Sequence, residues 1–516
     1  MFWLKKCSIL IRAMNKTLES NGSGNGANGL LQQTPKTADQ PTAIALSPDV
    51  KQSQITFQTR DGLELRCAPL HITRFLVVFE LYDSVTVLRS SEVLSEFKII
   101  LRDRTVYSGH AVVGAIVDTG AVVTCEVKLD ESRWTDIDLG LLSQHDGSLA
   151  QEFKSFINAW QKLYKILPEF KIVIADMQSF FMDLRLWLDQ IELGVRSQPA
   201  GGQFDMEREA ILAVQEPIVK TALQILEKFE QAAQKVEPDI RAAHMNYMRR
   251  QIHPWVLCAP FIHRTFYKPL GYAGDYEMVN MMVRDPYEGN SVFAKIMNQI
   301  FLSTPPVVAH RDRLVYLTEL LGNETVRVSC HKRPTRIFNM GCGPAKEIQD
   351  FLKYCDVSQQ IYFTLLDFND ETLAYASKAL EDARQHNRRP AQFRMVKKSV
   401  NKLLKEASNI HSDEIKYDIV YCAGLLDYLA DPVSKRLLEI LYDLVAPGGL
   451  LAVTQVHDSN PSRNWMEYVL DWHLIYRNAQ QLTALAPDAI SPEQITVRST
   501  GAGVNIFLEI RRPENA

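Results

Sequence analysis

Hydrophobic and polar residues follow three successive patterns along the chain. Between residues 54 and 130, short alternating or apolar runs such as "QITFQT", "RFLVVFEL" and "AVVTCEVKL" stand between polar, glycine-containing breaks. Between residues 148 and 305, apolar residues recur every three or four positions, and from residue 311 onward short apolar runs alternate with helical stretches. These periods predict, in order, a set of strands, a set of long helices and an alternating arrangement of strands and helices.

The strand-rich part predicts a small antiparallel β-barrel over residues 51–135. Its runs are rich in β-branched and aromatic residues, and short strands at this spacing are typical of barrels and sandwiches. The predicted turns between the strands are Asp61-Gly62, Ser108-Gly109 and Thr119-Gly120.

The order and lengths of these runs resemble a PilZ barrel, a module with which many bacterial proteins bind cyclic diguanylate. That family holds its ligand with an R-x-x-x-R segment and a following D/N-x-S-x-x-G turn. The corresponding region here reads "LRCAPLHITRF", in which Arg66 and Arg74 are too widely spaced for the motif. We therefore expect a PilZ-like barrel used for packing or regulation, and we do not expect it to bind cyclic diguanylate.

The middle part, residues 148–305, predicts an α-helical region built on a hairpin or bundle arm. Two long amphipathic segments, one containing "FKIVIADMQSFFMDLRLWLDQIEL" and the other "MEREAILAVQEPIVKTALQILEKFEQAAQKVE", are separated by the helix-breaking "QPAGG". Long apolar stripes serve either core packing within the monomer or formation of a homodimer, and the pattern does not separate the two.

The last part, residues 311–516, predicts a doubly wound α/β domain with a Rossmann-like, mostly parallel sheet. Its strands are "RIFNM", "IYFTLLDF", "AQFRMVKKSV", "YDIVYCAG" and "GLLAVTQVH", each followed by a helical stretch. The final two runs, "QITVRST" and "VNIFLEIRR", lie close enough together to form a hairpin.

Residues 1–50 predict a disordered tail, because their Asn, Gly, Ser, Thr and Gln cannot bury enough apolar surface to fold. The opening "MFWLKKCSILIRAM" is too short and too charged to span a bilayer, and it lacks the cleavage site of a secretory signal. We interpret it as a tail without a folded role; contact with a membrane surface is the alternative. No other segment reaches the length of a transmembrane helix.

Composition narrows the class of protein. A chain of 516 residues is too long for one core, and 46% apolar and 23% charged residues are ordinary for a soluble multidomain protein. The formal net charge of −4 gives no general attraction to nucleic acid. Eight scattered cysteines without a C-x-x-C pair are typical of reduced thiols, so we expect a cytoplasmic protein.

The glycine loop in "RIFNMGCGPAKEIQDFL" stands between a predicted strand and a predicted helix. Asp367 closes the next strand, where a carboxylate can accept hydrogen bonds from both hydroxyls of a ribose. A phosphate loop of the Walker type needs a Lys-Ser or Lys-Thr pair, and a dinucleotide loop needs a third glycine where Lys346 stands. S-adenosylmethionine (SAM) carries no phosphate and needs only a close approach to the backbone, so it fits this loop best.

The motifs "YDIVYCAGLLDYLAD" and "LVAPGGLLAVTQVH" follow the loop in an order that resembles class I SAM-dependent methyltransferases. The resemblance covers about the last 200 residues and departs from the family at Asn339, where an acidic residue usually helps to seat the methionine end of SAM. It implies SAM as cofactor, held at the methionine, ribose, adenine and methyl positions in turn by Met340, Gly341, Cys342, Gly343, Asp367, Phe368, Ser399, Val400, Cys422, Ala423 and Gly424. For Cys422, a thiol packed in the core is the alternative.

Two segments offer residues that could act on a methyl acceptor. His457 follows the fifth strand of the α/β domain at the sheet edge where such folds bind ligands. Tyr272 and Asp275 lie in the Gly-bracketed turn of "FYKPLGYAGDYEMVNMMV", which we interpret as a lid, with Asp275 as a helix cap in the alternative. We name these three as candidate catalytic residues. We predict no metal site, because the spacing of His253, Cys258 and His263 fits no standard zinc site.

The segment "KPLGYAGDYEMVN", the helical middle and the methyltransferase motifs together resemble a bacterial family associated with the synthesis of 3-hydroxypalmitic acid methyl ester, a quorum-type signal. This resemblance implies O-methylation of a fatty-acid-like carboxylate, a reaction that needs no strong base. An acyl chain would suit the aromatic stripe of Trp465, Tyr468, Trp472 and Tyr476, which fits an ordinary core equally well. The alternatives are a regulatory binding protein with a degenerate methyltransferase fold, and a methyltransferase for a protein or a polar metabolite.

Overall fold

The computed structural model describes residues 53–59, 64–72, 75–81, 88–101, 104–118, 123–130, 133–134, 166–356, 359–406, 415–501 and 503–514. All of them belong to one compact unit, Ser47–Ala516. The predicted tail and its opening segment, the predicted turns at residues 61–62 and 119–120, and Arg74 lie outside the described residues.

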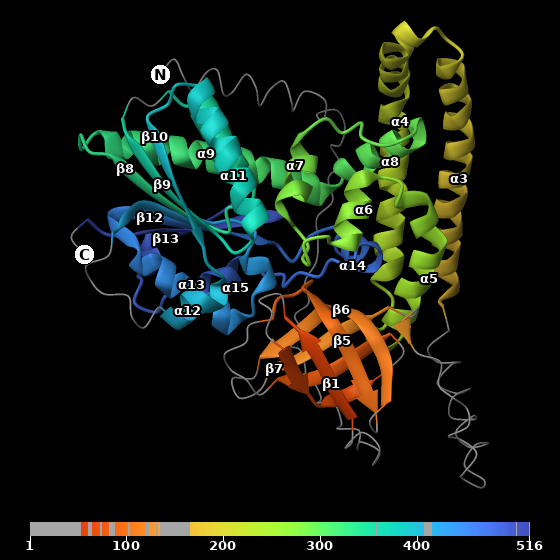
Figure 1. Ribbon diagram of the computed structural model, residues 1–516, viewed down its shortest axis with the longest axis horizontal. Helices are drawn as coiled ribbons and strands as arrows, with labels where there is room; N and C mark the ends of the chain where they lie inside the picture. Colours follow the sequence, from red (N-terminus) through yellow and green to blue (C-terminus); the bar gives the residue numbers. More distant parts are fainter. Residues whose placement is uncertain are drawn as a thin grey trace, which may run out of the picture. The chain divides into compact units, whose positions relative to one another are not determined.

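The first part forms a seven-stranded antiparallel sheet that coils into a nearly closed barrel (Figure 1). Its order is β2-β1-β5-β6-β7-β4-β3. Phe57, Phe79 and Phe97 meet inside it with ring centroids 5.4–6.3 Å apart. The predicted barrel is confirmed, and its PilZ identity stays a prediction. The strands are β1 (Ser53–Gln58), β2 (Glu64–Cys67), β3 (Pro69–Ile72), β4 (Leu76–Leu81), β5 (Val93–Leu101), β6 (Arg104–Asp118) and β7 (Val123–Leu129).

The turn predicted at Ser108-Gly109 is wrong, because both residues lie inside β6. They pair with Lys98 and Phe97 of β5. A Cβ atom at Gly109 would stand 3.0 Å from Cγ of Arg133, so the glycine serves close packing of the chain rather than a reversal.

The helical region is built on two long helices, α3 (Pro168–Arg196) and α4 (Gln203–Ala233), which lie side by side (Figure 1). They are joined across the predicted "QPAGG" break, where Ala200–Gly202 forms a single 3₁₀ turn. One apolar stripe packs inward, with Phe170 and Phe229 5.8 Å apart. The remaining helices are α5 (Pro238–Val256), α6 (Pro260–Tyr267), α7 (Tyr276–Val283) and α8 (Val292–Leu302).

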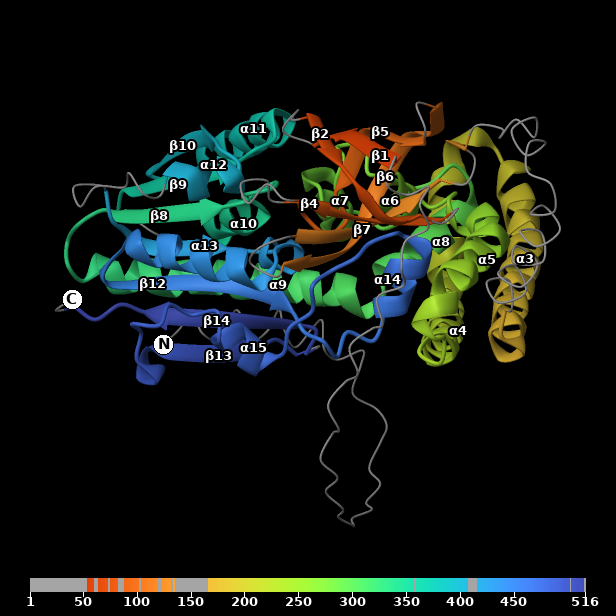
Figure 2. The ribbon, with the colours of Figure 1, turned by 90° about the horizontal axis from the view of Figure 1, so that it is seen from below.

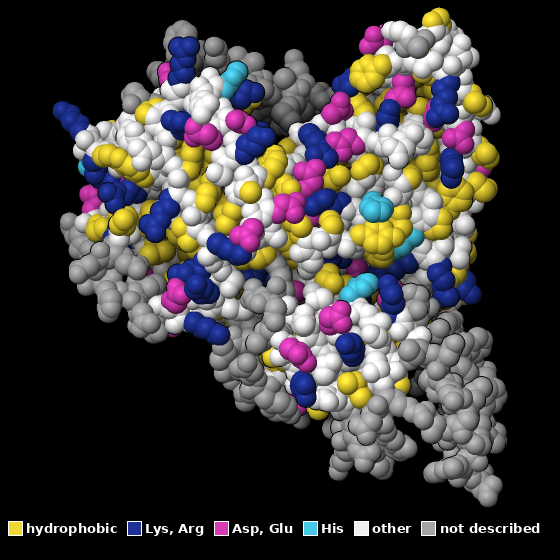
Figure 3. Space-filling view, in the orientation of Figure 1, with side chains coloured by type: hydrophobic (Ala, Val, Ile, Leu, Met, Phe, Trp, Pro, Cys, Tyr) yellow, Lys and Arg dark blue, Asp and Glu magenta, His cyan; other side chains and the backbone are white. Residues whose placement is uncertain are grey.

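Other apolar side chains of α3 and α4 remain exposed, among them Ile172, Leu186, Leu193 and Phe204. On the face drawn in Figure 3, the described basic and acidic side chains are interspersed with such apolar ones. Dimerisation through this region stays a prediction.

The last part is a seven-stranded sheet in the order β10-β9-β8-β11-β12-β14-β13. Figure 2 shows the labelled strands β10, β9, β8, β12, β14 and β13 in this order across the sheet. Neighbouring strands from β10 to β12 are parallel, and β14 and β13 form the predicted antiparallel hairpin. The strands are β8 (Thr335–Met340), β9 (Ile361–Asp367), β10 (Ala391–Lys397), β11 (Tyr417–Cys422), β12 (Val445–Val456), β13 (Ile495–Ser499) and β14 (Asn505–Arg511).

Helices pack on both faces of this sheet. One face is covered by α9 (Pro305–Ser329), α10 (Lys346–Tyr354) and α11 (Asp370–His386), and the other by α12 (Val400–Glu406), α13 (Asp431–Asp443) and α15 (Ala479–Thr483). The short α14 (Arg463–Val469) follows β12 and joins the core of the helical region. The predicted α/β domain is therefore confirmed, and its strand order reverses between β8 and β11, where such sheets bind ligands.

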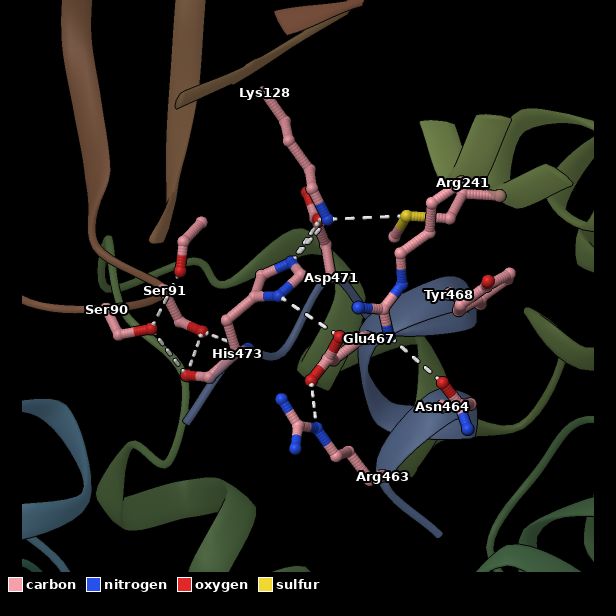
Figure 4. A network of polar contacts seen from close by, with 12 residues as sticks. Ser90, Ser91, Lys128, Arg241, Arg463, Asn464, Glu467, Tyr468, Asp471 and His473 are labelled. Carbon is pink, nitrogen blue, oxygen red and sulfur yellow. Dashed lines mark hydrogen bonds and ion pairs between the residues drawn. The ribbon is translucent and has the colours of Figure 1, made fainter. Parts of the chain in front are cut away.

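A buried polar network joins the barrel, the helical region and the segment after α14 (Figure 4). Asp471 lies 3.4 Å from Nζ of Lys128 on β7, 3.0 Å from Arg249 on α5 and 3.0 Å from Nε2 of His473. Although burial alone would raise the pKa of Asp471, Arg249 and Lys128 hold it well below its usual value. The hydroxyl of Ser91 donates to the His473 carbonyl and accepts from its backbone N–H, which anchors residues 88–92 of the barrel to this segment.

Candidate active site

A cavity lies at the carboxyl edge of the α/β sheet, where the strand order reverses. Its wall combines the glycine loop after β8, the end of β9, the loop after β11, the predicted lid, α9 and residues 89, 90 and 92 of the barrel. The predicted cofactor residues that line it are Met340, Gly341, Cys342, Gly343, Asp367, Phe368, Val400, Ala423 and Gly424. Ser399 and Cys422 are outside the lining.

Cys422 is fully buried in the core of the α/β domain. Burial raises the pKa of its thiol to about 12, so the thiolate does not form near neutral pH. The alternative of a packed core thiol therefore describes this side chain.

The glycine loop presents its backbone to the cavity. The amides of Gly341 and Cys342 both donate to the carbonyl of Leu366, at 2.7 and 3.2 Å, which ties the loop to the end of β9. Gly341 and Gly343 have φ of +71° and +51°, a conformation that favours glycine. No atom lies within 4 Å of a Cβ built at Gly343, so a ligand can approach the main chain there.

Asp367 is held in a fixed orientation at the end of β9. One carboxylate oxygen accepts from the amides of Phe368 and Asn369 at 2.8 and 3.1 Å, and the other accepts from the Gly343 amide at 3.3 Å. The neighbouring Phe368 ring contacts Tyr272 edge to face, with centroids 5.3 Å apart, and the Arg89 guanidinium lies 5.5 Å from its centroid. Lid, strand end and barrel thus form one aromatic and cationic wall.

Asn339 forms a buried cluster with two neighbours. Its side-chain amide donates to Oε1 of Glu347 at 3.1 Å and to the hydroxyl of Tyr421 at 2.8 Å, and that hydroxyl donates to Glu347 at 2.7 Å. Glu347 lies in the first turn of α10, lines the cavity, and has its pKa raised by burial. Oδ1 of Asn339 is buried without a hydrogen-bond partner. The carboxylate of Glu347 therefore lies next to position 339, where the family motif usually has an acidic residue.

The predicted lid turn packs on both the barrel and the α/β domain. The Gly271 carbonyl accepts from the Val93 amide at 3.0 Å, and a Cβ at Gly274 would stand 2.9 Å from the Tyr428 hydroxyl. Tyr272 lines the cavity.

Asp275 is the N-cap of α7, as the alternative interpretation expected. It accepts from the Met278 amide at 2.8 Å and pairs with Nε of Arg264 at 2.9 Å. It is buried but is not among the residues that line the cavity.

His457 follows β12, and its amide donates to the Val504 carbonyl at 2.7 Å. Its Nδ1 lies 2.7 Å from the Ser459 hydroxyl. His457 also stands outside the cavity lining, whereas Asn460 and Ser462 of the same segment lie in it. The catalytic roles of His457, Asp275 and Tyr272 stay predictions.

Many of the side chains that line the cavity are apolar. Trp465 stacks on Phe301 with centroids 5.0 Å apart, and Trp472 donates from Nε1 to Tyr428. Tyr468 instead packs fully buried in the helical core, and neither it nor Tyr476 lines the cavity. Of the four aromatic residues predicted from the sequence, Trp465 and Trp472 line the cavity, as expected for a site that holds an acyl chain, whereas Tyr468 packs in the core. The apolar lining includes Phe261, Ile262, Met278, Met282, Phe301, Val307, Trp465, Met466, Leu470 and Trp472.

Several cavity residues were not predicted from the sequence. His310 and Arg313 lie one turn apart on α9, and this spacing was the available signal that they share a face. Nothing in the sequence indicated that Arg89, Glu347 or Asn505 would reach the same cavity, because tertiary packing brings them there.

The histidines near Cys258 have separate surroundings. Nε2 of His253 lies 2.9 Å from the Val469 carbonyl, and the His263 ring packs on Tyr267. Within the described parts of the chain, no group of three or more His, Cys, Asp or Glu side chains is arranged to hold a metal ion. In those same parts, the helices are all too short or too polar to cross a bilayer.

Residues 338–451 match the family model of a methyltransferase domain. The match runs from β8 into β12 and so includes the glycine loop, Asp367 and Gly424. The C-terminal α/β domain is therefore similar to known methyltransferase domains. A comparison with curated proteins finds no significant match.

Solved structures give weaker likenesses. A possible exported protein of Bordetella parapertussis is 16% identical (TM-score 0.38), covering 57% of this chain and 97% of its own. The N-methyltransferase NodS of Bradyrhizobium japonicum, in complex with S-adenosylhomocysteine (SAH), is 16% identical (TM-score 0.28; 46% and 98%). An O-methyltransferase family protein of Burkholderia thailandensis is 14% identical (TM-score 0.32; 72% and 98%). Because these scores are low, the assignment rests on the family match and on the geometry of the cavity.

Proposed function

We propose that this chain is a SAM-dependent methyltransferase that esterifies the carboxylate of an apolar, fatty-acid-like acceptor. The observation that carries the proposal is the cavity itself, which is lined both by the glycine loop of the methyltransferase-like domain and by many apolar side chains. An acyl chain can lie in the apolar part while its carboxylate reaches the end of β11.

The residues around the loop fit SAM. The open backbone of Gly341 and Gly343 leaves room for the cofactor, and the fixed Asp367 carboxylate suits a ribose diol. Oδ1 of Asn339, which lacks a hydrogen-bond partner, and the adjacent Glu347 would receive the ammonium group of the methionine end. When bound, SAM supplies an electrophilic methyl group on a sulfonium.

The protein's part in the reaction is to orient the acceptor and to exclude water. A carboxylate is ionised near neutral pH, so no residue has to remove a proton from it. Bond formation between its oxygen and the methyl carbon accompanies cleavage of the carbon–sulfur bond, and the electron pair of that bond remains on sulfur. This route requires no general base in the cavity lining. It is therefore consistent with the finding that His457 and Asp275 do not line the cavity.

Cofactor binding is tested by calorimetry with SAH. We expect micromolar binding by the wild-type protein and a loss of about 1–3 kcal/mol of binding free energy in Asp367→Ala, since two hydrogen bonds to a charged acceptor disappear. Asp356→Ala is the matched control, because this exposed carboxylate stands outside the cavity. Wild-type protein that does not bind SAH would refute the proposal.

The acceptor is tested by incubating the protein with methyl-labelled SAM and a cell lipid extract, followed by mass spectrometry. We expect label in base-labile methyl esters of fatty acids. Label found only in protein or in polar metabolites would exclude the acyl acceptor. Binding of cyclic diguanylate without affinity for SAH would favour the regulatory alternative.

A further inference from the structure

His310 and Arg313 lie in the first half of α9, at the wall of the cavity. Both line the cavity, and they touch each other, with NH2 of Arg313 2.8 Å from Nδ1 of His310. Arg313 also reaches the end of β11, where a Cβ at Gly424 would lie 2.9 Å from its NH1. The loop containing Gly424 is the one expected to face the methyl group, so this cationic group stands beside the transfer site.

Polar atoms of this pair lack hydrogen-bond partners. A guanidinium can only donate, so Nδ1 of His310 accepts from Arg313 and Nε2 carries the hydrogen. That Nε2 and Nε of Arg313 are both buried without a partner. His310 itself is 8% exposed, and burial is the main reason its pKa lies well below the usual value, which keeps the ring neutral. Two unsatisfied N–H donors therefore belong to side chains that line one cavity.

The charge of Arg313 also lacks a direct counterion within the described residues. The carboxylates that influence it most are Asp427 and Glu347, and neither forms an ion pair with it. Asp427 accepts from Nε2 of Gln455 at 2.9 Å and from the Val456 amide at 2.6 Å, while Glu347 accepts from Asn339 and Tyr421. A permanent cation with free donors, set in a cavity, is complementary to an anion.

We propose that His310 and Arg313 form a carboxylate-binding site at the methyl-transfer centre. The inference rests on the proposed function only in that the cavity holds SAM and its acceptor. Each of those compounds brings one carboxylate, SAM at its amino-acid end and the acceptor at its reacting end. The two sources share the chemistry that the site recognises, and experiment separates them.

The site has a different consequence for each source. With the cofactor's carboxylate, the pair fixes the amino-acid end while Asn339 and Glu347 hold the ammonium. With the acceptor's carboxylate, the pair holds one oxygen and leaves the other free to take the methyl group. The ester that forms is neutral, so its attraction to Arg313 falls once the reaction is complete, which favours release.

The test uses the full-length protein and three probes: SAH, 5′-methylthioadenosine, which lacks the amino-acid part, and palmitate added in the presence of SAH. Calorimetry is carried out on the wild type, Arg313→Gln and Arg313→Lys. Arg327→Gln is the matched control, because it makes the same change on α9 outside the cavity. Circular dichroism checks that each variant is folded. Where Arg313→Gln does not fold, His310→Phe replaces it, since it removes the Nε2–H donor but keeps the ring volume.

A loss of tenfold or more in SAH affinity, with methylthioadenosine affinity unchanged, assigns the site to the cofactor. An equal loss in palmitate affinity, with SAH affinity unchanged, assigns it to the acceptor. In either case Arg313→Lys retains part of the affinity, because it keeps the charge but not the planar fork. A third outcome is that the wild type binds SAH, Arg313→Gln binds SAH equally well, and palmitate binding is either unchanged or absent. That result would overturn the proposed carboxylate-binding site but not the proposed function. Parallel loss of SAH and methylthioadenosine affinity also overturns it, and wild-type protein without SAH affinity refutes the proposed function instead.

Discussion

Asn339 and Glu347 show how one position in a motif depends on its neighbour in space. The amide group of Asn339 donates to the Glu347 carboxylate, and both side chains are buried. Two carboxylates in this cluster would repel each other and would lose that hydrogen bond. An amide at position 339 is therefore the residue that a buried acid at position 347 requires.

We expect that restoring an acid by Asn339→Asp destabilises the protein. The substitution replaces a donor by a second acceptor beside Glu347, which should lower the free energy of unfolding by about 1–3 kcal/mol. SAH affinity should not improve. Urea unfolding and calorimetry measure the two quantities.

The double variant Asn339→Asp/Glu347→Gln is the control, because it returns the cluster to one carboxylate. We expect it to recover most of the lost stability, as coupled neighbours do in a double-mutant cycle. An Asn339→Asp protein that is as stable as the wild type and binds SAH more tightly would contradict this account of Glu347.

The site residues predicted from the sequence are those that lie next to a motif. Gly341, Gly343 and Asp367 could be named because a loop between strand and helix, and a strand end one unit later, have roles that local spacing reveals. Glu347 and Arg313 could not be named as site residues from the sequence. An acidic residue in the first turn of a helix, or a basic residue on a helix, is usually exposed to solvent. Only their burial in the cavity distinguishes them.

At the scale of elements, α5 contains a histidine whose protonation opposes folding. Nε2 of His253 lies 2.9 Å from the Val469 carbonyl, and its ring packs on Phe266. Burial, with a smaller effect of nearby Arg249, lowers the pKa of His253 to about 4, although the hydrogen bond with the Val469 carbonyl and the charge of Asp471 oppose the shift. In the unfolded chain this pKa is about 6.5. Between these values the unfolded state binds more protons, so stability rises with pH.

We therefore expect the free energy of unfolding to fall as pH decreases from about 6.5 to 4, with His253 contributing at most about 3 kcal/mol. In His253→Gln the slope should be shallower. Part of the pH dependence should remain in this variant, because burial also lowers the pKa of His473 to about 4. Urea unfolding at four pH values across this range measures the slope. An identical slope in wild type and variant would exclude His253 as a source.

The period of apolar residues predicted the strands of both sheets well, because each strand alternates or is buried on both faces. It failed at Ser108-Gly109, where a glycine inside a strand has the same local signature as a turn. A glycine is needed at this position because the Arg133 side chain packs against it. Arg133 is far from Gly109 along the chain but adjacent to it in space, so the local sequence does not reveal the contact.

At the scale of the whole molecule, the barrel supplies part of the cavity wall. Arg89 lies against Phe368, and Ser90 and Ser91 are bonded to the His473 carbonyl. The barrel is thus a structural component of the proposed cofactor site, whatever else it binds.

We expect Arg89→Ala to weaken SAH binding by about three- to tenfold, the range of a partly desolvated cation–π contact, with little change in the melting temperature. Arg66→Ala, which removes an exposed arginine elsewhere on the barrel, should leave binding unchanged. Calorimetry on both variants decides the question. Equal affinities in the wild type and Arg89→Ala would show that the barrel does not contribute to this wall.

The bonds between Ser91 and His473 join residues separated by 382 positions in the chain. During synthesis the barrel leaves the ribosome long before its partner segment exists. At typical rates of translation the delay is roughly 20–80 s. During that time residues 88–92 of the nascent chain lack the segment to which they hydrogen-bond in the folded protein. This anchor of the cavity wall can therefore form only near the end of translation, so a chain that ends before residue 473 would lack it.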